Sequence, residues 1–220
     1  MAKLKKNVTV RTHNRRVAVS SKNPAGTTVV DQHIRHLSGT FLDPEIIQEI
    51  TESYPLKGVT IPTADDLGCP DGNKYDKQIA IWADYFAKKF KEQPAIHSNI
   101  IKALIGSESS FEADPSGNKV ASGIAQITKP TFKALLAADG EAKEFIFRKV
   151  RQKDLKNPDI AIPMGIRWLY VKQKLAKHKL GRWPSPEELI LEYKGMLKSQ
   201  TKFKDKALKN FRKKYATLQN

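Results

Sequence analysis

The sequence predicts a mainly α-helical domain preceded by a small β or irregular N-terminal extension. Apolar residues recur at helical spacing over most of the chain, from about residue 76 onward. The first 40 residues instead alternate polar with β-branched positions, as strands do. Between these regions, proline and glycine interrupt any regular pattern. The expected organisation is therefore an extension at residues 1–40, a connecting segment at 41–75 and a helical domain at 76–220.

The N-terminal extension is expected to be a short basic hairpin or an arm. Val8 and Val10 alternate with polar residues, and residues 17–19 repeat that pattern. β-Branched residues at every second position are typical of a strand. A turn signal follows at residues 23–26, where Asn, Pro and Gly lie close together.

Residues 41–75 are expected to hold one short helix and a linker. The run Asp43-Pro44-Glu45 indicates a helix start, because proline is favoured in the first helical turn. This helix ends before Pro55. Residues 55–75 contain six Pro or Gly residues, which is typical of an extended loop or linker.

Capping signals divide the helical domain into further helices. One begins near Lys74, and the next begins with Ser98 or Asn99 as its N-cap. Three more are expected to start near Thr128, after Asn157, and at the capping box of Ser185 and Glu188. The last helix has apolar residues at intervals of four and lysines on its other face. Its apolar residues are Phe203, Ala207, Phe211 and Tyr215.

The net charge of +16 is concentrated at the two ends of the chain. Residues 1–22 and residues 196–220 each carry +7, which leaves +2 for the residues between them. Both ends are therefore suited to an anionic wall or membrane surface, although charge alone does not distinguish these from nucleic acid. The N-terminal basic run lacks interleaved aromatic residues, and no helix-turn-helix or phosphate-binding loop is present. Nucleic acid is therefore not expected as a partner.

Cysteine content and hydropathy exclude several classes of protein. The single cysteine, Cys69, excludes an intramolecular disulfide framework and the usual structural zinc patterns. No metal or other cofactor is expected. No segment approaches the roughly 20 apolar residues of a membrane span, and the basic N-terminus lacks the apolar region of a secretory signal. We therefore expect synthesis in the cytoplasm without a Sec-type signal and no transmembrane segment.

Glu108 is the candidate catalytic residue. It continues the apolar stripe of Ile101, Leu104 and Ile105, because residues three, four and seven apart share one face of a helix. A carboxylate in this place is either partly buried or at the solvent-exposed end of the stripe. Burial disfavours the charged form of a carboxyl group, as a general acid near neutral pH requires. The alternative is a helix that ends near Gly106 and leaves the carboxylate exposed in a loop.

Three short motifs occur in order around this residue. They are Glu108-Ser-Ser-Phe111, Gly123-Ile-Ala-Gln126 and Glu192-Tyr193-Lys194-Gly195. Together they resemble the soluble-type lytic transglycosylases, a family of the lysozyme-like superfamily that cleaves bacterial peptidoglycan. The similarity covers about residues 96–195 and implies a lysozyme-like helical fold, and it leaves a phage endolysin and an antibacterial effector both open as the type of enzyme. The chain departs from the family at Gly117, where a serine is usual, and at Lys194, where an asparagine is usual.

The resemblance also implies a role for each motif. Glu108 would first protonate the glycosidic oxygen and then deprotonate the muramic acid 6-hydroxyl, giving a 1,6-anhydro sugar. Gln126 would offer its amide to the sugar, and Tyr193 would direct its hydroxyl toward Glu108. Ser116, Ser122 and Gly123 complete the implied substrate-binding residues. Without the resemblance, Gln126 and Tyr193 would be interpreted as a helix-capping amide and a core tyrosine.

Two other functions remain open at this point. A goose-type lysozyme-like hydrolase would attack with water, and Asp114 would be the candidate for the second carboxylate that activates it. A non-catalytic wall- or nucleic-acid-binding protein would use the two basic ends. As an enzyme, the protein is expected to act in the periplasm or cell wall after delivery by a holin, a phage particle or a secretion system.

Overall fold

The computed structural model describes residues 6–10, 13–16, 27–30, 33–37, 40–115 and 120–219. The chain divides into two compact units, residues 1–40 and residues 41–220. The structure is mainly helical, as the sequence predicted, and the helices all belong to the second unit. Within the described ranges, no helix is both long enough and apolar enough to span a membrane.

The first unit contains two antiparallel strand pairs. β1 (Lys6–Val10) pairs with β4 (His33–Leu37), and β2 (His13–Arg16) pairs with β3 (Thr27–Val30). The second pair is nested inside the first along the chain, which is the strand order of a long hairpin. The strand predicted at residues 17–19 and the turn predicted at residues 23–26 lie outside the described residues.

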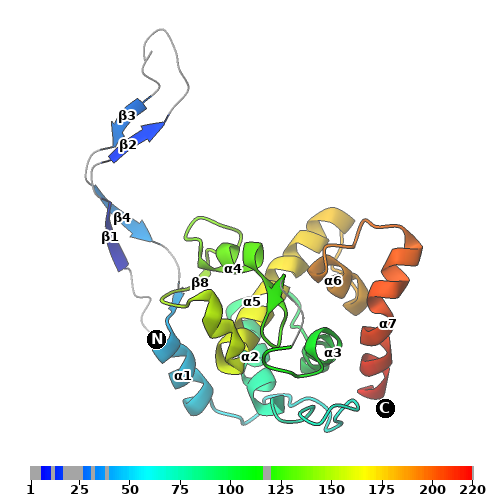
Figure 1. Cartoon of the computed structure of the whole chain (residues 1–220). Coiled ribbons are helices and arrows are strands. Elements are labelled where there is room, and N and C mark those ends of the chain that lie inside the picture. The colour runs from blue at the N-terminus through cyan, green and yellow to red at the C-terminus, as the bar shows by residue number, and fades with distance from the viewer. Residues whose placement is uncertain are drawn as a thin grey trace. The chain divides into compact units, whose positions relative to one another are not determined.

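Helices α1 to α7 build the second unit, with α5 at its centre. Their bounds are α1 Pro44–Ser53, α2 Asp76–Lys89, α3 Ser98–Ser109, α4 Lys129–Leu136, α5 Pro158–Leu180, α6 Pro186–Tyr193 and α7 Thr201–Thr217, with the 3-10 helix η1 at Gln152–Lys156. The central helix α5 contacts α1, α2, α4 and α6 (Figure 1). Two short strand pairs complete the unit. They are β5 (Thr40–Leu42) with β8 (Phe145–Phe147), and β6 (Ala121–Ser122) with β7 (Ile127–Thr128).

Most helices begin where local capping chemistry predicts. In α4, α5 and α6 a side-chain oxygen at the N-cap accepts a hydrogen bond from a backbone N–H of the first turn. These caps are Thr128, Asn157 and Ser185. The start of α3 corrects the sequence prediction of Ser98 or Asn99 as the N-cap. His97 takes that place, and its ring Nδ1 accepts from the Asn99 N–H at 3.2 Å.

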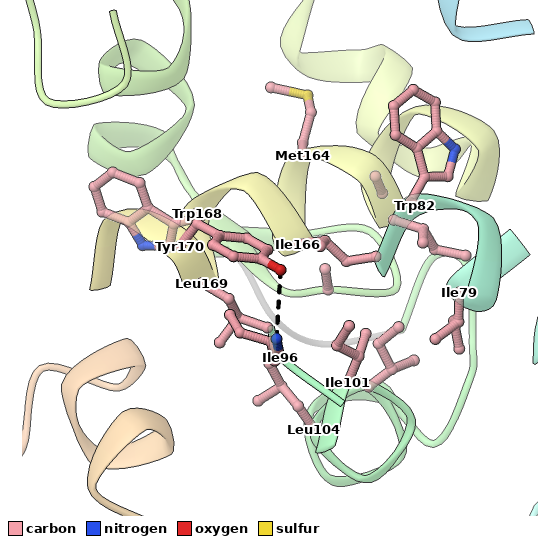
Figure 2. Packing of buried hydrophobic residues seen from close by; sticks show 14 of the residues in the cluster. Ile79, Trp82, Ile96, Ile101, Leu104, Met164, Ile166, Trp168, Leu169 and Tyr170 are labelled. Atoms are coloured by element: carbon pink, nitrogen blue, oxygen red, sulfur yellow. Dashed lines mark hydrogen bonds between the residues drawn. The ribbon is translucent and has the colours of Figure 1, made fainter. Parts of the chain in front are cut away.

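Helices α2, α3 and α5 contribute to one hydrophobic core. Trp82 of α2, Leu104 of α3 and Leu169 of α5 are all buried, and Figure 2 shows them among the side chains of this core. The hydroxyl of Tyr170 accepts a hydrogen bond from the Ile96 N–H at 3.3 Å, drawn as the dashed line in Figure 2. This bond gives the polar end of a buried ring a partner, as interior polar groups require.

The segment predicted as a linker, residues 55–75, belongs to the second compact unit. It has no regular secondary structure, but a buried lysine of α3 fastens it to the helical core. The Lys102 ammonium donates to the Thr63 carbonyl at 2.9 Å, to Asn73 Oδ1 at 2.7 Å and to Asp76 Oδ2 at 2.8 Å. Burial raises the pKa of the Asp76 carboxyl, and the adjacent ammonium opposes that rise. The segment is therefore held by a buried polar cluster that its own composition does not indicate.

Helix α7 packs on α3 and α6, and its apolar face only partly matches the predicted stripe. Leu208 and Phe211 are buried, and Tyr215 is partly buried against the same core. Phe203, however, is 47% exposed. Residues four apart differ by about 40° around a helix of 3.6 residues per turn, so a series at that interval drifts off one face. The predicted helix is correct, whereas Phe203 does not belong to its buried face.

Candidate active site

Glu108 lies in the last turn of α3, which continues through Ser109. The helix therefore does not end near Gly106, and the alternative that places Glu108 in a loop is excluded. Its side chain is 16% exposed, whereas Ile101 and Leu104 on the same face are buried. The carboxylate thus lies at the edge of the core, where it is partly shielded from bulk water but not fully buried.

A salt bridge joins Glu108 to Lys194. The ammonium of Lys194 donates a hydrogen bond to Glu108 Oε1 across 86 positions of sequence. Lys194 is the C-cap residue of α6, and its side chain is 20% exposed. Sequence comparison marked Lys194 only as a departure from the family motif. Its place directly after Tyr193 is the signal that links it to the site.

Tyr193 lies beside the salt bridge and connects α6 to the turn at residues 123–126. Its hydroxyl donates a hydrogen bond to the Ala125 carbonyl at 2.7 Å. The sequence prediction directed this hydroxyl toward Glu108, so the observed bond differs from it. Burial is the main cause that raises the pKa of Tyr193, and the charge on Glu108 raises it further. The phenol therefore stays neutral and donates a hydrogen bond, and it lies close enough to Glu108 for the charge of that carboxylate to affect its pKa.

The turn at residues 123–126 is built from internal contacts that its sequence alone does not show. Gly123 has a φ of +73°, and a Cβ there would lie 2.0 Å from the Leu155 carbonyl oxygen, so only glycine fits. Gln126 is buried, and both its backbone N–H and its side-chain Nε2 donate to the Gly123 carbonyl at 2.9 Å. The amide that was expected to face the sugar also stabilises the turn.

Helix α5 forms the base of this region at Gly165. A Cβ at Gly165 would lie 2.6 Å from the Ala125 Cβ and 3.9 Å from the Tyr193 hydroxyl. The absence of a side chain lets α5, the turn and the end of α6 meet at one place. Sequence reasoning did not single out Gly165 for this role, although the glycine interrupts an otherwise apolar run in the helix.

The remaining predicted residues lie in different surroundings. Ser122 is half-buried in β6, next to the turn, whereas Ser116 and Gly117 lie outside the described residues. Asp114, the candidate second carboxylate of a hydrolase, has a 58% exposed side chain and pairs with Lys156 at 2.7 Å. Among the described side chains, no group of three or more His, Cys, Asp or Glu residues could hold a metal ion.

Comparison with known families gives a match. Residues 85–191 match the family model of the Transglycosylase SLT domain. The chain contains a transglycosylase SLT domain. Members of the SLT family are lytic transglycosylases that act on peptidoglycan, and the match, which covers a little under half of the chain, supports an enzyme of this class. The matched residues of the chain include Glu108 and the turn at 123–126, and they end at residue 191, just before Tyr193. No curated protein matches the chain.

Proposed function

We propose that the enzyme cleaves the β-1,4 bond between N-acetylmuramic acid and N-acetylglucosamine and forms a 1,6-anhydromuramic acid end. Glu108 would be its only catalytic carboxylate. The observation that carries this proposal is the contrast between two acids. Both acids pair with a lysine, but the Glu108 side chain is partly buried at 16% exposed, whereas that of Asp114 is 58% exposed. Glycoside hydrolysis usually needs two carboxylates, but one suffices when the substrate supplies its own nucleophile.

The proposed reaction uses one carboxyl group twice. Glu108 in its protonated form gives the proton to the glycosidic oxygen while the bond from that oxygen to muramic acid C1 breaks. The resulting carboxylate then takes the proton of the muramic acid 6-hydroxyl, whose oxygen bonds to C1 and closes the anhydro ring. No water is consumed, and Glu108 ends the cycle protonated. This is general acid catalysis followed by general base catalysis by the same group.

We further propose that the turn at 123–126 lines the sugar subsite beside Glu108. Tyr193 supports this placement, because it bonds to the turn and its phenol senses the charge of Glu108. Ser122, next to the turn and half-buried, offers a hydroxyl, and the backbone of Gly123 allows close approach. Gln126 and Ser116 complete the proposed substrate-binding residues by resemblance to the family. In this proposal Tyr193 holds the turn of the subsite in place and does not contact the reacting atoms.

Digestion of purified peptidoglycan is expected to give fragments that end in 1,6-anhydromuramic acid. Mass spectrometry of the released muropeptides would show products lighter by one water than those of a hydrolase. Reduction with borohydride would leave these ends unchanged, because an anhydro sugar has no free reducing end. Borohydride-reducible muramic acid ends as the main product would instead show that water attacks, and would replace the transglycosylase mechanism by a hydrolytic one.

The variant Asp114→Asn separates the two mechanisms at the level of residues. If Asp114 has no role in the reaction, the Asp114→Asn variant should cleave peptidoglycan within about threefold of the wild-type rate. Loss of its ion pair should matter little, because an exposed ion pair contributes only roughly 0–1 kcal/mol to folding stability. The matched control is Lys156→Gln, which removes the same ion pair from its other side. A large loss in Asp114→Asn with none in Lys156→Gln would identify Asp114 as the activator of water.

We also propose that α7 binds the anionic wall surface. Four exposed lysines lie at intervals of four, three and four along this helix, which places them on one face. They are Lys202, Lys206, Lys209 and Lys213, here called the lysine stripe. The nearby Asp205 is bound by Arg212 at 2.9 Å, and no acidic partner is recorded for the stripe among the described residues. Such a row of unneutralised cations is suited to the carboxylates of wall peptides.

Replacing the four lysines of the stripe by glutamine is expected to weaken binding to purified cell walls roughly tenfold at low salt. Cleavage of soluble glycan fragments should stay near the wild-type rate, because the stripe is separate from Glu108. Co-sedimentation with walls would measure the first effect. A matched control removes four scattered exposed lysines, Lys57, Lys77, Lys91 and Lys143. Equal loss in both variants would mean that net charge, and not the stripe, controls binding.

The cellular role follows from the substrate. We propose that cleavage lyses bacterial cells, as a phage endolysin or an antibacterial effector does. The enzyme would then act in the periplasm or cell wall after delivery by a holin, a phage particle or a secretion system. A fall in turbidity of outer-membrane-permeabilised cells, absent when Glu108 is replaced, would support this role.

A further inference from the structure

The salt bridge between Lys194 and Glu108 occupies the atom that must carry the proton in the proposed reaction. Its two side chains are only 20% and 16% exposed, so the charges are partly withdrawn from water. An ammonium ion beside a carboxylate favours the ionised form of that carboxylate. The first step, however, requires Glu108 in its protonated form. The resting arrangement and the acid step therefore need opposite states of the same group.

Helix electrostatics explain why a lysine lies at this position. Glu108 is in the last turn of α3 and Lys194 caps the C-terminus of α6, so two negative helix ends meet here. The last turns of both helices contain no basic residue. A carboxylate at a helix C-terminus is unfavourable, and a cation there is favourable. Lys194 thus compensates both helix ends and the carboxylate with a single charge.

The other titratable groups that face this region cannot take its place. Tyr193 is kept neutral, since burial and the charge of Glu108 both raise its pKa, and its hydroxyl is directed to the Ala125 carbonyl. Lys214 of α7 passes close to α3 at Gly106. Its ammonium donates instead to the Leu67 carbonyl at 2.9 Å and contacts the Cys69 sulfur at 3.1 Å. Among the described residues, Lys194 is the cation that pairs with Glu108.

We propose that Lys194 is a positioning residue that holds Glu108 ionised and in place in the free enzyme and releases it when the glycan binds. The inference rests on the proposed function, because it assumes that Glu108 is the acid. When the sugar displaces the ammonium, the carboxyl group loses its cationic neighbour and its affinity for a proton rises next to the glycosidic oxygen. Glu108 then becomes protonated beside the glycosidic oxygen that receives its proton.

This device predicts different pH profiles for the free enzyme and the enzyme–substrate complex. The profile of kcat/KM reports groups in the free enzyme, and that of kcat reports groups in the complex. In Lys194→Met, the high-pH limb of kcat/KM should move to higher pH, because the variant lacks the adjacent positive charge that favours a carboxylate in its ionised form. The kcat profile should move much less, because the ammonium has already left Glu108 in the complex. Lys194→Arg should keep the wild-type profiles.

A second measurement tests the same inference without turnover. Carbon-13 labelling of glutamate allows the carboxyl signal of Glu108 to be followed through a pH titration, and its absence in Glu108→Gln identifies it. The midpoint should rise in Lys194→Met and stay in place in Lys194→Arg. Exposed Lys198→Met is the matched control and should leave the midpoint unchanged.

The outcomes distinguish this inference from the proposed function. If Glu108→Gln stays active, the proposed function fails. If Glu108→Gln is inactive but Lys194→Met has wild-type profiles and midpoint, only the role of Lys194 is overturned. Equal shifts of kcat and kcat/KM would also overturn it, since the salt bridge would then persist in the complex.

Discussion

Glu108→Gln is expected to abolish release of anhydromuropeptides while the protein stays folded. The amide has nearly the same shape as the carboxyl group, and its oxygen can still accept the hydrogen bond from Lys194. It can neither give nor take the proton that both steps require. Loss of a general acid and base lowers rates by at least about a hundredfold. Chromatography of digested walls would measure the rate, and circular dichroism would establish that the variant is folded.

The matched control for this variant is Glu112→Gln, which changes an exposed carboxylate of the following loop. Exposed substitutions of this kind shift stability by about 0.5 kcal/mol or less, so its activity should stay within about twofold of wild type. Retention of more than about a tenth of wild-type activity in Glu108→Gln would remove Glu108 from the mechanism, because that loss is below the range of general acid catalysis.

The features of the fold that sequence predicts best depend on neighbouring residues. The starts of α4, α5 and α6 follow from a cap and a proline within a few positions, and the structure has Thr128, Asn157 and Ser185 in those places. The position of Glu108 within α3 follows from helical periodicity in the same way. Such signals are local, because capping and periodicity concern residues within one or two turns.

Contacts between distant segments were not predictable by the same reasoning. Lys102 appears in sequence as one polar residue of α3, and nothing near it indicates that it is fully buried against Asn73 and Asp76. Its partners lie 29 and 26 positions away. The salt bridge of Glu108 with Lys194 joins residues 86 positions apart. Pairings of this kind depend on how helices pack, which periodicity does not determine.

The turn at 123–126 shows that residues predicted to bind substrate can have a structural role. Gly123 and Gln126 were predicted as substrate-binding residues from resemblance to a family. The structure shows in addition that Gly123 allows contact with the Leu155 carbonyl and that Gln126 closes the turn on itself. Both contacts require the same residue types that the motif contains. A motif can therefore be recognised from sequence, whereas the division between structural and substrate contacts requires coordinates.

Removal of residues 196–220 is expected to unfold the helical unit. The segment buries four large side chains, Leu197, Leu208, Phe211 and Leu218, in the common core. Each contributes about 1.5–3 kcal/mol on burial, so their combined loss is comparable with the roughly 5–15 kcal/mol of a whole domain. The Leu218 carbonyl also accepts from Asn99 Nδ2 at 2.7 Å, so that buried amide would lose one of its partners and keep only those at Thr63.

The four-lysine stripe variant is the control that separates the two possible roles of this segment. It keeps every buried side chain of α7 and removes only exposed charges, so it should unfold at nearly the wild-type temperature. The truncated protein, in contrast, should lack the cooperative thermal transition in circular dichroism and should aggregate, because the apolar faces of α3 and α6 that α7 covers become exposed. A truncated protein that melts cooperatively and still cleaves soluble glycan would contradict this expectation. It would show that α7 serves wall binding alone, and that the core formed by α2, α3 and α5 is sufficient to hold Glu108 in place.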